Sequence, residues 1–136
     1  MADSLKLAVE KAWANHLGAD AGVTVPVYAS RRDEEAEPPY VVCTIGQMSE
    51  TVPRANAYQI EMDVVLVSHI DESTSEAHSA HLSALKAAID TVPSKGDDAA
   101  QDVRIYGWAQ QASAPAKDDQ YFADVLTLVI GAGRLT

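Results

Sequence analysis

The segment from residue 58 to residue 92 has the clearest pattern of hydrophobic and polar positions in the chain. Its first part alternates, and its hydrophobic members share one face: Tyr58, Ile60, Met62, Val64 and Leu66. Because strand side chains point alternately to two faces, this alternation predicts a β-strand. The second part follows helical spacing along one stripe: His78, Leu82, Leu85, Ile89 and Val92. Pro93 can end this helix, and we expect the strand and helix to form the centre of the hydrophobic core.

The remaining pattern predicts one more helix and four more strands. The helix is expected near the N-terminus, with hydrophobic residues on one side: Leu5, Val9, Trp13 and Leu17. The β-branched and aromatic runs at residues 23–28, 40–49, 103–108 and 121–130 predict strands. Two polar stretches, residues 50–56 and 110–119, predict extended hairpin connections.

The order of these elements indicates an α+β fold. We expect a mostly antiparallel sheet of about five strands, packed against one long helix plus a short N-terminal helix. A chain of 136 residues is long enough to bury a sizeable core by itself. We therefore expect a single domain over residues 1–136.

The chain is acidic, with a formal net charge of -10. Binding of nucleic acid through phosphate contacts needs clustered Lys and Arg, and only Arg31 and Arg32 are adjacent. Specific phosphate binding is therefore not expected, although an acidic surface can enclose DNA without holding it. Cys43 is the only cysteine, which excludes an intramolecular disulfide and a thiolate metal cluster. The longest hydrophobic run, residues 125–130, is far shorter than the ~20 residues of a membrane helix, so we expect no membrane partner.

Three histidines lie close together in the sequence: His69, His78 and His81. Two histidines three residues apart can face one side of a helix, as zinc ligands do. The His-Glu-x-x-His pattern of metalloproteases is absent, however. His78 also lies on the hydrophobic stripe of the predicted helix. We therefore favour a structural role for it and expect neither a metal nor a cofactor.

Two further groups contain the residue types of catalytic sites. Ser68, His69 and Asp71 supply those of a serine-hydrolase triad, but neighbours in sequence point in different directions and no G-x-S-x-G motif accompanies them. Glu61 and Asp63 share one strand face, as general acid and base residues can. We favour a solvated face or a subunit contact for this pair, and we expect no catalytic residue.

Several blocks of this sequence resemble the tail-terminator or tail-completion proteins of long-tailed bacteriophages. The blocks are Pro38-Pro39-Tyr40-Val41-Val42, Gln59-Ile60-Glu61-Met62-Asp63-Val64-Val65, Leu85-Lys86-Ala87-Ala88-Ile89-Asp90 and Tyr121-Phe122-Ala123-Asp124-Val125-Leu126. The similarity covers roughly residues 5–131 and consists of hydrophobic blocks rather than a fixed motif.

The resemblance implies a structural virion protein and not an enzyme. Such subunits form a hexameric ring that caps the head-proximal end of the tail tube, stops polymerisation and joins the tail to the neck or head. The implied partners are other copies of the chain, the tail tube protein and a neck or head-completion protein, while DNA passes through the lumen without specific binding. The implied location is the tail or neck of the virion, assembled in the cytoplasm of the host bacterium.

The polar hairpins and sheet faces supply the candidate residues for contacts between subunits or with the tube. These residues are Arg31, Arg32, Thr51, Arg54, Asn56, Glu61, Asp63, Trp108, Gln111 and Lys117. Two alternatives remain open from the sequence. One is another head-tail connector or neck adaptor protein. The other is a small cytosolic enzyme that uses Glu61, Asp63 and a histidine.

Overall fold

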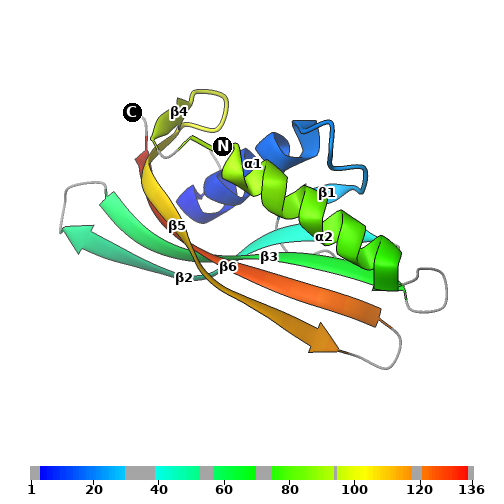
Figure 1. The fold of residues 1–136 in the computed structure, drawn as a ribbon. Coiled ribbons are helices and arrows are strands. Elements are labelled where there is room, and N and C mark those ends of the chain that lie inside the picture. The colour runs from blue at the N-terminus through cyan, green and yellow to red at the C-terminus, as the bar shows by residue number, and fades with distance from the viewer. Residues whose placement is uncertain are drawn as a thin grey trace.

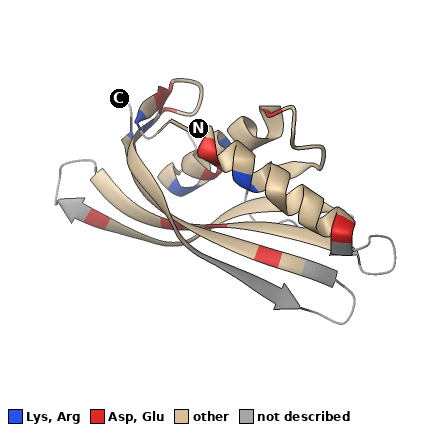
Figure 2. Cartoon of the chain, viewed as in Figure 1, with Lys and Arg blue, Asp and Glu red and all other residues tan. Residues whose placement is uncertain are grey.

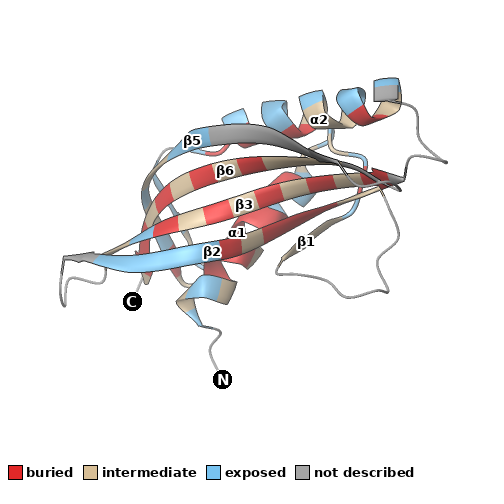
Figure 3. Cartoon of the chain, turned by 90° about the horizontal axis from the view of Figure 1, so that it is seen from below, coloured by how far each residue is buried: buried red, intermediate tan, exposed pale blue. Residues whose placement is uncertain are grey.

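The computed structural model describes residues 4–29, 39–52, 57–69, 75–93, 95–117 and 121–134. These residues form two helices and one six-stranded sheet (Figure 1). The helices are α1 (Leu5–Ala19) and α2 (Ser75–Asp90). The strands are β1 (Val27–Ala29), β2 (Tyr40–Val52), β3 (Ala57–His69), β4 (Gly96–Asp98), β5 (Val103–Lys117) and β6 (Tyr121–Arg134). Both helices lie on one face of the sheet, and no helix covers the other face in the described part (Figures 1 and 3).

The strand order across the sheet is β1-β2-β3-β6-β5-β4. Strand β1 pairs with β2 in parallel, whereas every other neighbouring pair is antiparallel. The four long strands are β2, β3, β6 and β5, and the sheet is curled into a half-barrel (Figure 1). The short strands β1 and β4 form its two edges.

The hydrophobic core lies between the two helices and the face of the sheet that they cover. The strand residues in it are fully buried, among them Ile60, Met62, Val64, Leu66, Leu126, Leu128 and Ile130. Helix α1 contributes Val9, Trp13 and Leu17, and helix α2 contributes Leu85 and Ile89. The side chain of Ser4 starts α1 by accepting a hydrogen bond from the backbone N–H of Leu7 at 3.2 Å. The strand and helix predicted at the centre of the core are thus β3 and α2.

The predicted architecture, a mostly antiparallel sheet of about five strands with one long helix and a short one, is wrong. The sheet has six strands and is mixed, and α1 and α2 are nearly equal, at 15 and 16 residues. The missed strand β4 has a Gly-Asp-Asp sequence without a strand pattern, and it is extended because it pairs with the start of β5. Strand β5 also continues to Lys117, through residues predicted to form a polar connection.

Candidate assembly surfaces and a buried polar network

Both edges of the sheet are open over part of a long strand. Strand β1 covers only Val41, Val42 and Cys43 of β2, and β4 covers only Val103, Arg104 and Ile105 of β5. Within the described ranges, no strand lies on the outer side of residues 44–52 of β2 or of residues 106–117 of β5. We call the first part of each open side, residues 44–49 and residues 106–111, the β2 edge and the β5 edge. Apart from the Ile45 N–H, which donates to Glu10, their outer backbone donors and acceptors form a template for pairing with another chain.

The two edges differ in composition from the rest of the same open strand sides. The β2 edge reads TIGQMS and the β5 edge reads YGWAQQ, so neither contains a charged residue or a proline, whereas Glu50 follows in β2 and Pro115 and Lys117 follow in β5. Natural proteins commonly protect open edges with charged side chains, particularly Lys, and with Pro. The large hydrophobic side chains that are exposed in the described part are Met48, at 41%, and Tyr106, at 43%. One of them lies on each edge.

The face of the sheet without helices is weakly acidic at its centre. Glu61 and Asp63 of β3 lie on this face because the alternate residues Ile60, Met62 and Val64 are buried beneath the helices. Asp63 accepts a hydrogen bond of 2.9 Å from the hydroxyl of Thr127 on the neighbouring strand β6. Figure 2 shows acidic positions but no Lys or Arg along the described central part of β3.

The structure places the ten candidate contact residues in different settings. Arg31, Arg32, Arg54 and Asn56 lie outside the described residues, as do the side chains of Thr51 and Lys117. Glu61 and Asp63 share the helix-free face, and Gln111 is exposed at the end of the β5 edge. The sequence analysis did not identify the two open edges, although their lack of charge in an acidic chain was a signal that could have indicated them.

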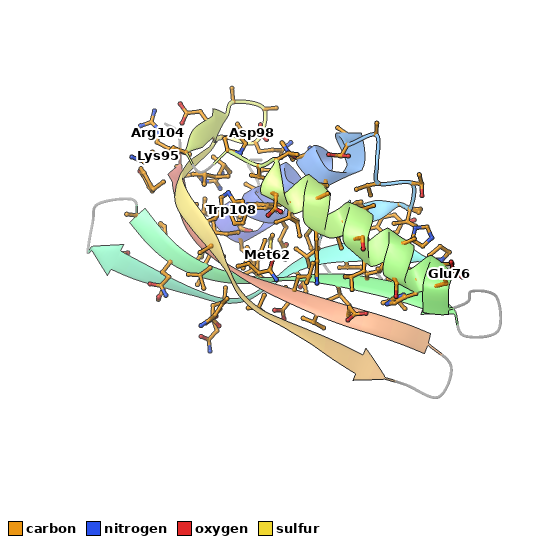
Figure 4. The ribbon with its side chains drawn as sticks, viewed as in Figure 1. Met62, Glu76, Lys95, Asp98, Arg104 and Trp108 are labelled. Atoms are coloured by element: carbon orange, nitrogen blue, oxygen red, sulfur yellow. The ribbon has the colours of Figure 1, made fainter. Side chains whose placement is uncertain are left out.

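Trp108, the remaining candidate, packs toward the helices rather than away from them (Figure 4). Its ring lies edge-on to that of Trp13, with a centroid distance of 5.4 Å and an interplanar angle of 89°. Its indole nitrogen donates to the carbonyl oxygens of Val92 and Pro93, both at 3.2 Å. Trp108 therefore fixes the end of α2 against β5, and a cavity of about 450 Å³ lies beside the Trp13 ring.

A Ser–His–Asp network, not the one considered from the sequence, joins three elements. His78 of α2 hydrogen-bonds through Nδ1 to the Ser68 hydroxyl of β3 at 2.8 Å, and through Nε2 to Asp124 Oδ2 of β6 at 2.7 Å. A carboxylate only accepts hydrogen bonds, so Nε2 carries a proton toward Asp124. Ser68 is completely buried and His78 is 6% exposed. Because the Ser68 hydroxyl is closed off from solvent, we interpret the network as a structural link. The group considered from the sequence, Ser68, His69 and Asp71, falls partly outside the described residues.

The histidines that the structure describes lie in separate settings. Among the residues that the structure describes, no group of three His, Cys, Asp or Glu side chains is arranged to hold a metal ion. His81 is half-exposed on α2, and His16 of α1 instead lies 3.1 Å from the hydroxyl of Thr91.

A buried carboxyl group connects α1 to the start of the β2 edge. Glu10 is 2% exposed, and its Oε2 accepts a hydrogen bond of 2.8 Å from the backbone N–H of Ile45. The pairing of β2 with β3 is irregular between Ile45 and Gln47, so the carboxyl group satisfies a donor at a β-bulge. Burial raises the pKa of Glu10 above its ordinary value of 4.5, while the Ile45 hydrogen bond and nearby Lys6 act in the opposite direction.

We expect Glu10→Gln to change how stability depends on pH. A raised pKa means that the folded state binds the Glu10 proton more tightly than the unfolded state, so this group destabilises the fold as pH rises from 4.5 through the folded pKa. Urea unfolding measured between pH 4 and pH 8 should show wild type losing stability relative to the variant as pH rises above 4.5. A difference that stays constant or has the opposite sign would contradict this assignment, and Glu76→Gln, exposed at the start of α2, is the control.

The comparisons with known proteins do not identify a relative. A scan against protein-family models and a search of curated protein sequences both returned no match. In the described part of the chain, neither helix has the length and hydrophobicity needed to cross a membrane. The functional interpretation of this chain therefore depends on its own surfaces, above all on the two open, uncharged strand edges.

Proposed function

We propose that this chain is a structural virion protein that forms a hexameric ring on the head-proximal end of a phage tail tube. In this role the ring stops polymerisation of the tube and joins the tail to the neck or head. Two independent supports favour the proposal. One is the resemblance of the sequence to tail-terminator proteins, and the other is the presence of an open edge on each side of one sheet. The pair of open edges is the observation on which the proposal chiefly depends.

Two different open edges on one subunit are compatible with assembly in closed rotational symmetry. When a surface on one copy binds a different surface on the next, the contact is heterologous, and a suitable rotation between copies closes it into a ring. A closed ring has no free subunit contact around its circumference. Its two remaining faces are then available for different partners, the tube on one side and the neck on the other.

The distribution of charge agrees with a channel through which DNA passes. In the proposed ring the helices lie on the outer circumference. The helix-free face, with Glu61 and Asp63 at its centre, then lines the lumen. Carboxylates there repel the phosphate backbone and oppose its adhesion to the wall, as does the net charge of -10.

The proposal is tested by measuring ring formation and tube growth together. Light scattering and negative-stain images of the purified 14.5 kDa chain should show a ring with the mass of six copies and a central hole. Adding the chain to polymerising tail tube protein of the same virus should shorten the tubes and leave a ring at one end. Heat-denatured chain serves as the control.

Different results separate the alternatives. A ring that binds portal complexes and leaves tube length unchanged would replace this proposal with the neck-adaptor role. A chain that remains monomeric and leaves tube growth unchanged would contradict both roles.

A further inference from the structure

We propose that copies of this chain join by adding the β5 edge of one copy to the β2 edge of the next, so that the sheet continues across the subunit boundary. This inference rests on the ring of the proposed function and identifies the surface that builds it. The partner is a second copy of this chain, and the contact consists of backbone hydrogen bonds between two antiparallel strands.

The strand directions permit this contact without any rearrangement. The long strands occur in the order β2-β3-β6-β5, and each neighbouring pair is antiparallel. Directions therefore alternate across the sheet, and β5 runs opposite to β2. When a second copy is placed beside the first in the same orientation, its β2 meets the β5 of the first copy as an antiparallel partner, which is the more stable type of pair.

The two edges also lie at the same level of the sheet. Following the pairing across the strands, Gln47 is opposite Glu61, then Val129, then Ala109. In the same way, Met48 is on the level of Trp108. The pairing is irregular between Ile45 and Gln47 and between Glu50 and Val52 in β2, and around Tyr106 and Gln111 in β5. Residues 47–49 and 107–110 lie between these positions and keep a regular register. Neighbouring copies could thus pair along these residues with little displacement along the strand axis.

The chemistry of the edges favours a second copy over other occupants. The residues proposed to pair, 47–49 and 107–110, contain no charge or proline that would block strand addition, and Glu50, Pro115 and Lys117 lie outside them. Met48 and Tyr106 lose exposed hydrophobic surface when a neighbour is added. Symmetric pairing of two β2 edges would leave both β5 edges open. Head-to-tail pairing uses both edges of every copy, and it is therefore the arrangement that can close.

Paired cysteines test this contact directly. Gln47 and Ala109 are exposed, and within one copy they are separated by three strand spacings, or about 14 Å. A disulfide requires Cα atoms about 4.4–6.8 Å apart, so Gln47→Cys with Ala109→Cys can form one only between copies. Ser49→Cys with Ala109→Cys covers a register displaced by two residues. Cys43 is fully buried and does not compete.

We expect at least one of the two double variants to give a ladder of disulfide-linked species up to the ring, visible on a non-reducing gel and lost on reduction. Each single variant can form at most a dimer, and Ser83→Cys with Ala109→Cys, in which Ser83 is exposed on α2, controls for random collision. The inference is wrong if neither double variant cross-links beyond these controls, whether or not rings are present.

A lysine substitution provides a second, independent measurement. Ser49→Lys places a charge on the β2 edge, and Ser83→Lys makes the same change on the outer side of α2. With the fold of both variants checked by circular dichroism, light scattering should show association weakened by roughly tenfold or more for Ser49→Lys alone. Equal association of the two variants would overturn the inference.

The results also separate this inference from the proposed function. Rings that shorten tubes but do not cross-link contradict only the edge pairing. Cross-linked rings that leave tube growth unchanged contradict only the role at the tail tube.

Discussion

Replacing Trp13 with alanine is expected to lower the free energy of unfolding by about 3–5 kcal/mol. The side chain is 1% exposed, lies among buried residues of α1 and the sheet, and contacts the ring of Trp108. Removing it leaves a cavity at the point where α1 meets β5, and the surrounding strands cannot collapse fully into that space. Urea unfolding followed by far-UV circular dichroism measures the loss, at one protein concentration so that assembly contributes equally.

Trp13→Phe is the matched control for this prediction. The indole N–H of Trp13 is buried and has no hydrogen-bond partner in the described structure. Phenylalanine keeps most of the ring and removes that unsatisfied donor, so we expect a clearly smaller loss than for alanine. If both variants lost the same stability, or if Trp13→Ala lost less than about 1 kcal/mol, Trp13 would not be the packing centre that the structure indicates.

Replacing His78 with alanine is expected to cost about 2–4 kcal/mol of folding stability. The imidazole bridges the buried Ser68 hydroxyl and the Asp124 carboxylate, at 2.8 and 2.7 Å. Without the imidazole, the Ser68 hydroxyl, which is completely buried, loses this hydrogen-bond partner. The Asp124 carboxylate, whose side chain is 17% exposed, loses it as well. His81→Ala, three residues further along α2 and half-exposed, is expected to change stability by less than about 0.5 kcal/mol.

A combined variant separates the cost of leaving groups unpaired from the net contribution of the network. Ser68→Ala, His78→Leu and Asp124→Ala together remove the polar groups, so none of the three remains unsatisfied. Replacing a whole buried polar cluster by hydrophobic residues can be close to neutral, and we expect the triple variant to be more stable than His78→Ala. A triple variant less stable than the single one would show that the network itself stabilises the fold.

Local sequence patterns were sufficient to predict a strand or helix wherever the buried side chains recur at the spacing of that element. The alternation of residues 58–67 and the helical stripe from His78 to Val92 correctly indicated β3 and α2, because each depends only on the spacing of hydrophobic side chains. The same reasoning missed β4, since a Gly-Asp-Asp segment has no strand pattern of its own. It also ended β5 too early, because the backbone pairing that extends it does not require hydrophobic side chains.

For the candidate site too, some features could be predicted from local sequence and others could be seen only in the fold. Alternation in β3 placed Glu61 and Asp63 on one sheet face, which the structure shows to be the helix-free face. It could not show that Ser68 and His78 would meet Asp124, which is 46 residues beyond His78. Nor could it show that residues 44–49 and 106–111 are the open edges, because an edge is defined by which strand is missing beside it.

By itself, the sequence determined an acidic chain with a strand and an amphipathic helix at the centre of its core, since charge and hydrophobic periodicity are properties of local residues. Only the tertiary structure decided that β1 joins β2 in parallel, that six strands form one curled sheet, and that two uncharged edges face outward. These features arise from pairing between distant segments. Pairing is set by how the whole chain buries its core and satisfies its backbone hydrogen bonds, which no single stretch of sequence specifies.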